Sequence, residues 1–172
     1  LVSDGRPVLF VQVRPGLGGR PFRLVKFRTL RTSDGEAVTD VSAGVTWVGQ
    51  ILRSTSLDEL PSLWNVIRGD LSLVGPRPLL MEYLPLYLPE HLKRHDVRPG
   101  MTGLSQVSGR NLVSWRQRFD MDIAYVRDCG FALDLKILLK TVLVVLGRRG
   151  VNRADGTMMP TLDANYHQQT DS

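Results

Sequence analysis

Two adjacent carboxylates, Asp58 and Glu59, stand where the sequence predicts the start of a helix. A helix N-terminus has free backbone N–H groups and the positive end of the helix dipole, so it stabilises carboxylates and also binds phosphate. One interpretation is that both acids simply cap the helix, and the pair taken alone favours it. The other is that Asp58 keeps a low pKa, stays ionised and attacks phosphorus, while Glu59 helps to hold a divalent cation. The neighbouring residues must decide between the two.

The helix that carries these acids is predicted from the spacing of its hydrophobic residues. They recur at i, i+3, i+4 and i+7, the pattern of one buried stripe: Leu60, Leu63, Trp64 and Ile67. Gly69 is expected to end the helix, but the sequence allows two alternatives for the residue at which the helix begins. Ser56 with Glu59 would form a capping box. Asp58 as the N-cap would instead place Pro61 in the first turn, where a missing N–H costs little.

Basic residues occupy two positions that suit a phosphate group. Residues 7–14 and 22–29 are predicted to be two strands of a hairpin around the glycine-rich loop 15–20, and Lys26 lies on the second strand. Arg77 stands between two prolines, whose stiff, extended backbone would present its guanidinium to phosphate at a small entropic cost. Taken singly, a solvated strand face and a proline-rich turn with an exposed arginine are the better interpretations.

Three further stretches complete the predicted elements. Residues 79–95 have hydrophobic residues at helical spacing, interrupted by two prolines. This pattern suits either a surface lying in a bilayer interface or short helices that cover a core. Ser114 is predicted to cap a helix whose hydrophobic stripe adjoins Asp122. The last helix, 135–146, is apolar nearly all round, so we expect it to be buried in protein or to lie against lipid.

Length and composition indicate a single folded domain with an anionic partner. The chain has 172 residues, of which 42% are hydrophobic, and its net charge of +5 suits nucleic acid, a phosphorylated metabolite or lipid head groups. No apolar run reaches the ~20 residues that a bilayer-spanning helix needs. We predict an α/β fold: a compact domain with a small antiparallel β-hairpin and several short, partly amphipathic helices. Residues 1–150 would form the catalytic domain and residues 151–172 a polar C-terminal tail.

Other kinds of active site have little support in the sequence. The three histidines lack the spacing of a zinc site, and Cys129 is the only cysteine. The chain has no Gly-x-Ser-x-Gly elbow, no dinucleotide fingerprint and no P-loop. What remains is an Asp-Glu pair, dispersed arginines and lysines, and glycine-rich loops, a pattern typical of phosphate chemistry.

With these residues laid out, the chain resembles the bacterial sugar transferase family, the monotopic polyprenyl-phosphate phosphoglycosyl transferases. The resemblance extends over roughly residues 4–150, and several motifs agreeing in order make a strong signal where any one would be weak. The matching stretches are Lys26–Thr29, Arg53–Pro61, Asn65–Pro78, Arg98–Gly103, Ser108–Asn111 and Asp122–Val126.

The resemblance implies a reaction and roles for particular residues. The family transfers a sugar 1-phosphate from a UDP-sugar to polyprenyl phosphate, usually undecaprenyl phosphate, and releases UMP; this step initiates the assembly of exopolysaccharide, O-antigen, capsule or glycoprotein glycans. By the same resemblance, Asp58 attacks the phosphate that bears the sugar and forms a covalent phosphosugar intermediate. Glu59, together with Asp58, would hold Mg²⁺. The implied phosphate-binding residues are Lys26, Arg53 and Arg77, and the implied further substrate-binding residues are Arg110, Asn111 and Asp122. The motif around Arg77 could instead shape the floor of the site.

The resemblance also implies a location. The family has an N-terminal hydrophobic helix that dips into one membrane leaflet, and the sequence here starts after it. We therefore expect the parent protein to be monotopic and to lie at the cytoplasmic face of the bacterial cell membrane, with the inner leaflet as a partner. An amphipathic surface alone would bind that leaflet weakly and reversibly.

Two rival functions stay open at this stage. A nucleic-acid-binding module is disfavoured, because the charges are dispersed and no recognition signature is present, so we expect no nucleic acid partner. A non-catalytic basic scaffold would share the same surface charges. The transferred sugar is not determined by the sequence, and a homo-oligomer is an open alternative.

Overall fold

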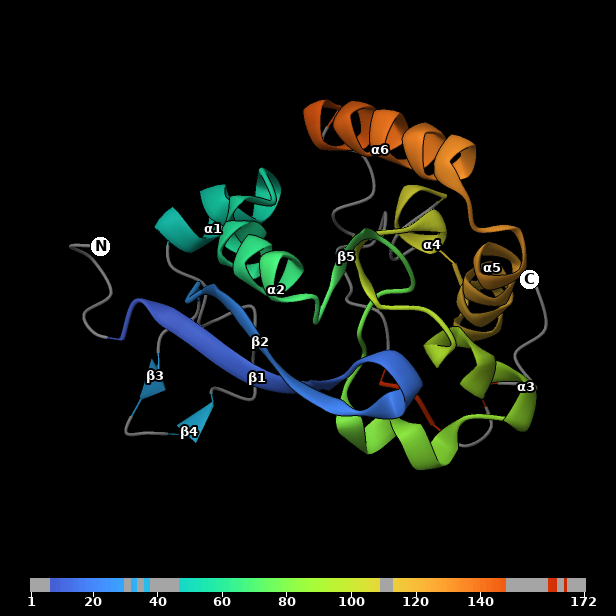
Figure 1. Ribbon diagram of the computed structural model, residues 1–172. Coiled ribbons are helices and arrows are strands. Elements are labelled where there is room, and N and C mark those ends of the chain that lie inside the picture. Colours follow the sequence, from blue (N-terminus) through green and yellow to red (C-terminus); the bar gives the residue numbers. More distant parts are fainter. Residues whose placement is uncertain are drawn as a thin grey trace.

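A β-hairpin, a series of short helices and two longer helices make up the architecture (Figure 1). The structure is a computed structural model, and it describes residues 7–29, 32–33, 36–37, 47–108, 113–147, 161–163 and 166. The predicted α/β class, with a small antiparallel sheet and several short helices, is confirmed.

The hairpin forms where the sequence predicts it. Strand β1 (Leu9–Pro15) pairs antiparallel with β2 (Pro21–Phe27), in a register that sets Leu9 opposite Phe27 and Pro15 opposite Pro21. The connection contains the short 3₁₀ helix η1 (Leu17–Gly19), in which Gly18 and Gly19 have φ values of 61° and 72°. Residues with a Cβ rarely adopt this left-handed conformation, which is why the turn needs glycine.

Two smaller strand pairs accompany the hairpin. Strand β3 (Thr32–Ser33) pairs antiparallel with β4 (Glu36–Ala37), and β5 (Ser72–Val74) pairs parallel with β6 (Gly100–Thr102). Next to the parallel pair, a Cβ on Gly100 would overlap the backbone nitrogen of Gly75. The amide of Gly100 also donates to the carbonyl oxygen of Pro76 at 3.0 Å. This close backbone packing fixes the segment that leads into Arg77.

The helices follow in chain order. They are α1 (Trp47–Ser54), η2 (Leu57–Ser62), α2 (Leu63–Arg68), η3 (Met81–Leu86), α3 (Pro89–Leu92), η4 (Lys93–His95), α4 (Leu104–Val107), α5 (Trp115–Asp128) and α6 (Phe131–Leu146). The predicted cap of α5 is confirmed, because Ser114 and Gln117 form a reciprocal capping box. Helix α6 begins four residues earlier than predicted, at Phe131.

The main core decides between the two interpretations of residues 79–95. Its buried members are mostly aromatic: Leu79, Tyr83, Tyr87, Trp115, Phe119, Leu162 and Tyr166. Short helices from 79–95 therefore cover a protein core. From the predicted polar tail, Leu162 and Tyr166 are buried in the same core, and the Tyr166 hydroxyl lies 2.6 Å from Nδ1 of His91.

The predicted buried stripe on α2 is wrong. Leu60, Leu63, Trp64 and Ile67 are 41–77% exposed, whereas Ser62 and Asn65 are 2% exposed. The reason is that, among the described strands, β2 pairs along one edge alone, with β1. Asn65 accepts from the Val25 amide at 3.2 Å and donates to the Arg23 carbonyl at 2.8 Å, and the Ser62 hydroxyl donates to the Val25 carbonyl at 2.7 Å. Satisfying these buried backbone groups draws the polar side of the helix inward.

Candidate active site

The acidic pair lies in a 3₁₀ helix docked against β2. Ser56, which precedes η2, has a left-handed backbone (φ 58°) and makes no side-chain capping bond. The helix starts at Leu57, so Asp58 and Glu59 are both inside its first turn. Neither of the two predicted caps is present, and neither carboxylate bonds a backbone amide among the residues described. The capping interpretation of the acidic pair is therefore wrong.

Glu59 is held by two cations from distant parts of the chain. Its Oε1 accepts from Lys26 Nζ at 2.6 Å and from Arg77 Nη2 at 2.8 Å, and its side chain is 18% exposed. Burial raises the pKa of Glu59, but the charges and hydrogen bonds of Arg77 and Lys26 outweigh it and hold the pKa at about 2. Glu59 is therefore ionised at any physiological pH. Within the described part of the chain, its Oε2 has no hydrogen-bond partner.

Asp58 is in the opposite state. No side chain or amide of the described residues donates a hydrogen bond to its carboxylate. Burial and the negative charge of Glu59 raise its pKa, and the positive charges of Lys26, Arg77 and Arg53 only partly offset them. The prediction of a low pKa for Asp58 is wrong, because desolvation and a like-charged neighbour outweigh the surrounding cations.

Arg53 lies near this pair without joining it. It lies in the last turn of α1, and its Nε donates to the Thr29 hydroxyl at 2.8 Å. Its charge lowers the pKa of Asp58, so the two groups are within electrostatic range. The structure thus brings together Asp58, Glu59, Lys26, Arg53 and Arg77, which come from four separate stretches of sequence.

Asp122 is placed elsewhere. It is 1% exposed, and its Oδ2 accepts from Arg94 at 3.1 Å (Nε) and 2.6 Å (Nη2), while its Oδ1 accepts from the Ser105 hydroxyl at 3.0 Å. The same Arg94 donates to the carbonyl oxygen of Arg77 at 2.8 Å. Asp122 therefore reaches the site only through Arg94, and a direct role in substrate binding stays a prediction. The other two predicted substrate-binding residues, Arg110 and Asn111, lie outside the described residues.

Sequence reasoning missed two arginines around the site. Arg94 anchors the backbone of Arg77, and its only signal was a basic run at the end of 79–95. Arg14, on β1, lines a cavity of about 70 Å³ together with Lys26, Glu59 and Arg77. Apolar side chains complete the wall of this cavity, among them Leu24, Leu71, Leu79 and Met101. No motif singled Arg14 out, since a cation on an exposed hairpin is common.

The residues present suit a magnesium ion better than a zinc ion. No cluster of three or more His, Cys, Asp or Glu side chains that could hold a metal occurs in the described ranges. Glu59 Oε2 and the carboxylate of Asp58 are nevertheless unbonded oxygen ligands side by side in the chain. Mg²⁺ is characteristically held by one or two carboxylates together with the phosphates of a substrate. The oxygen donors therefore fit that ion.

Two cations bond one carboxylate of this site, and the carboxylate next to it in the chain is unbonded within the described residues. This arrangement suits phosphate-bearing substrates. The chain belongs to the bacterial sugar transferase family, whose profile matches residues 1–148.

Three relatives show how far the similarity extends. An uncharacterized sugar transferase of Bacillus subtilis (EpsL) is 52% identical over 88% of this chain and 76% of its own length. A UDP-glucose:undecaprenyl-phosphate glucose-1-phosphate transferase of Caulobacter vibrioides is 47% identical over 83% of this chain and 57% of its own length. An undecaprenyl-phosphate galactose phosphotransferase of Salmonella typhimurium is 39% identical over 87% of this chain and 36% of its own length. The chain thus spans between about a third and three quarters of these relatives.

Proposed function

We propose that this chain transfers a sugar 1-phosphate from a UDP-sugar to polyprenyl phosphate, with release of UMP, at the start of glycan assembly. The names of the Caulobacter and Salmonella relatives support both substrates. Within the site, the proposal depends on one observation. Two adjacent carboxylates have opposite surroundings, since Glu59 is bonded to two cations and Asp58 is bonded to none of the described residues.

The two surroundings suit two roles. A carboxylate that is ionised, unbonded and partly desolvated is a strong nucleophile, which describes Asp58 above its pKa. An oxygen of Asp58 would form a bond to the phosphorus that bears the sugar, while the bond from that phosphorus to the bridging oxygen breaks and UMP leaves. An oxygen of the polyprenyl phosphate would then attack the same phosphorus and displace Asp58. The carboxylate is regenerated, and the sugar becomes linked to the lipid through a diphosphate.

The cations would stabilise the negative charge of the phosphate groups during this reaction. Lys26 and Arg77 already point at one oxygen of Glu59, so they are oriented before a substrate arrives. Asp58 and Glu59 would hold Mg²⁺, which supplies charge neutralisation of the donor diphosphate. Arg53 would add positive charge on the Asp58 side of the site.

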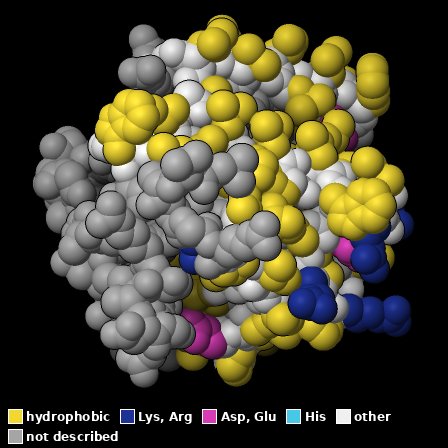
Figure 2. Space-filling model, turned by 90° about the vertical axis from the view of Figure 1, so that its left-hand side faces the viewer, with side chains coloured by type: hydrophobic (Ala, Val, Ile, Leu, Met, Phe, Trp, Pro, Cys, Tyr) yellow, Lys and Arg dark blue, Asp and Glu magenta, His cyan; other side chains and the backbone are white. Residues whose placement is uncertain are grey.

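An apolar surface supports a location on the inner leaflet of the cell membrane. Helices α1, α2 and α6, which carry many of the exposed hydrophobic side chains, lie in the upper part of Figure 1, and Figure 2 shows hydrophobic side chains across the upper part of one face. The most exposed are Trp47, Trp64, Ile67, Phe131, Leu139, Leu143 and Leu146, which are 58–84% exposed. Among the described helices, none has the length and apolar character needed to cross a bilayer. Vesicle co-sedimentation that Leu143→Glu leaves unchanged would count against this location.

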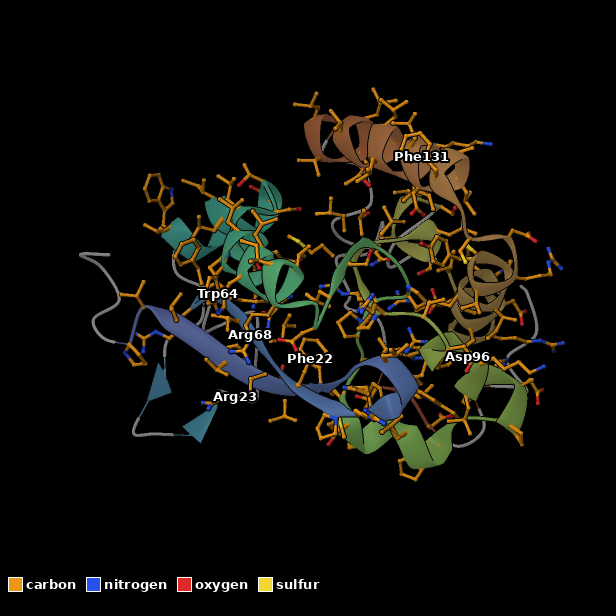
Figure 3. All side chains as sticks on the ribbon, in the orientation of Figure 1. Phe22, Arg23, Trp64, Arg68, Asp96 and Phe131 are labelled. Carbon is orange, nitrogen blue, oxygen red and sulfur yellow. The ribbon has the colours of Figure 1, made fainter. Side chains whose placement is uncertain are left out.

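The decisive experiment weighs the intact chain after incubation with Mg²⁺ and UDP-glucose or UDP-galactose, without lipid. We expect a mass gain of one hexose phosphate, with release of one UMP per chain. Asp58→Asn should abolish both, whereas Asp96→Asn, the same change at an exposed carboxylate (Figure 3), should leave both intact. UMP that appears only when polyprenyl phosphate is added, with no adduct, would instead indicate direct transfer. Neither adduct nor UMP under any of these conditions would refute hexose 1-phosphate transfer from these two donors.

A further inference from the structure

Cationic side chains outnumber carboxylates in the lining of the cavity beside Glu59. Three cationic side chains line it, Arg14, Lys26 and Arg77, against the single carboxylate of Glu59. Lys26 and Arg77 both bond that carboxylate. Arg14 does not, and no carboxylate of the described residues forms an ion pair with it.

The contacts of Arg14 are neutral and incomplete. Its Nη2 donates to the Gln12 side chain at 2.5 Å, and its Nη1 lies 3.5 Å from the Pro78 carbonyl oxygen, a long contact. Its Nε is buried and has no hydrogen-bond partner. A partly buried guanidinium has lost some of its hydration, and an anion that pairs with it offsets this cost. Burial, and next the positive charge of Arg77, lower the pKa of Arg14 to about 10, and the nearby Tyr83, Tyr87 and Glu82 offset this lowering only in part.

The chemistry of the lining indicates what the compensating anion can be. Three cationic side chains around one cavity of about 70 Å³ suit a phosphate group, whose oxygens accept hydrogen bonds from several donors. Arginine is the side chain best shaped for such a ligand, because its planar fork bonds two oxygens at once.

We infer that Arg14 is a third phosphate-binding cation of this site, which completes with Lys26 and Arg77 a pocket for one substrate phosphate. The inference deepens the proposed function and depends on it for the identity of the substrate. The phosphate has two potential sources, the donor diphosphate and the polyprenyl phosphate. The alternative is a structural role, in which Arg14 only ties β1 to the Pro78 segment.

Direct binding tests the inference without requiring turnover. Inorganic phosphate is titrated calorimetrically into the wild type, Arg14→Gln, Arg14→Lys and Arg23→Gln. Arg23 is the matched control, since it is an exposed cation on the same hairpin (Figure 3). We expect Arg14→Gln to weaken binding by about 10- to 100-fold, Arg14→Lys to recover part of the loss, and Arg23→Gln to bind as the wild type does. Equal affinity in Arg14→Gln and the wild type would overturn the inference.

A second measurement uses the unmodified chain, so it does not depend on a variant folding. Phenylglyoxal modifies arginines, and peptide mapping follows the rate at each one. Phosphate should slow the reaction at Arg14 and leave Arg23 unaffected. An unchanged rate at Arg14 would overturn the inference even if Arg14→Gln failed to fold.

Kinetics then identify the source of the phosphate. A raised KM for the UDP-sugar alone in Arg14→Gln would assign the pocket to the donor, and a raised KM for polyprenyl phosphate alone would assign it to the acceptor. Failure of the proposed function would appear separately, as a chain that binds phosphate through Arg14 but forms neither adduct nor UMP. A loss of kcat with both KM values and phosphate affinity unchanged would favour the structural role.

Discussion

Two groups of charged residues, the open cluster and the closed cluster, differ in how completely their bonds are made. The closed cluster is Arg94 with Asp122, both side chains 1% exposed. The open cluster is Glu59 with Lys26 and Arg77, whose side chains are 18–38% exposed.

In the closed cluster every carboxylate oxygen has a protein donor. Arg94 donates twice to one oxygen of Asp122, and Ser105 donates to the other. The guanidinium also bonds the Tyr87 hydroxyl and lies 5.3 Å from the centre of the Phe119 ring. In the open cluster two cations share one oxygen of Glu59, and the described residues leave its other oxygen unbonded.

Arg77 connects the two clusters, which act on different parts of this residue. Its carbonyl oxygen accepts from Arg94 of the closed cluster, while its guanidinium donates to Glu59 of the open one. A satisfied, buried pair fixes the backbone of Arg77, while the guanidinium of the same residue lies in the partly exposed open cluster.

The largest effect is expected from breaking the closed cluster. Asp122→Asn leaves the Arg94 charge buried without its partner, which should cost about 3–5 kcal/mol and lower Tm by roughly 6–20 °C. Thermal unfolding followed by circular dichroism measures it. The double variant Arg94→Met/Asp122→Leu, which removes both charges, should recover most of the loss. A raised KM at unchanged Tm would instead support the substrate-binding role implied for Asp122 by the family resemblance.

Glu59→Gln in the open cluster should cost less stability, about 1 kcal/mol near pH 7, because its partners are partly exposed. The folded pKa of Glu59 is about 2, below its ordinary 4.5, so its contribution is present above 4.5 and is lost as the pH falls towards 2. Urea unfolding of the wild type and of Glu59→Gln should therefore converge as the pH is lowered through this range. A difference between them that grows with acidity would contradict the ion pairs. Sugar transfer should fall by about 10²- to 10³-fold.

Asp58→Asn should act on stability in the opposite direction. Because its folded pKa is raised, the ionised carboxylate destabilises the fold at neutral pH, and this penalty disappears as the pH falls through that pKa. The variant should be more stable than the wild type near pH 7, by under about 1 kcal/mol, and should lose this advantage in acid. Parallel urea titrations at two pH values test the sign. A variant destabilised at neutral pH would mean that Asp58 has a stabilising partner.

The smallest effect is expected at an ion pair outside both clusters. Arg68 Nε lies 3.6 Å from Asp70 Oδ2, and the Arg68 side chain is 62% exposed at the end of α2 (Figure 3). Arg68→Ala should change the free energy of unfolding by no more than about 0.5 kcal/mol and leave sugar transfer unaltered. A larger change would contradict the comparison, in which the stability that an ion pair contributes falls as its distance and its exposure increase.

The sequence by itself determined the local elements and the motif that marks the site. The glycine-rich loop predicted the hairpin because only a few backbone conformations close so tight a turn, and Ser114 predicted the start of α5 because a cap acts within one turn. The family motifs pointed to Asp58, Glu59, Lys26 and Arg77, and the fold brings these four together. Their catalytic and binding roles stay predictions.

Only the tertiary structure decided which face of each element is buried and which charges are compensated. The spacing of Leu60, Leu63, Trp64 and Ile67 was recognised correctly, but that stripe is exposed because Ser62 and Asn65 satisfy the open edge of β2. The raised pKa of Asp58 depends on burial and on Glu59, and the partners of Arg94 and Arg14 are mostly distant in sequence. Periodicity reports that a helix has two faces, but the choice between them, like the charge state of a carboxylate, depends on neighbours that only the folded chain supplies.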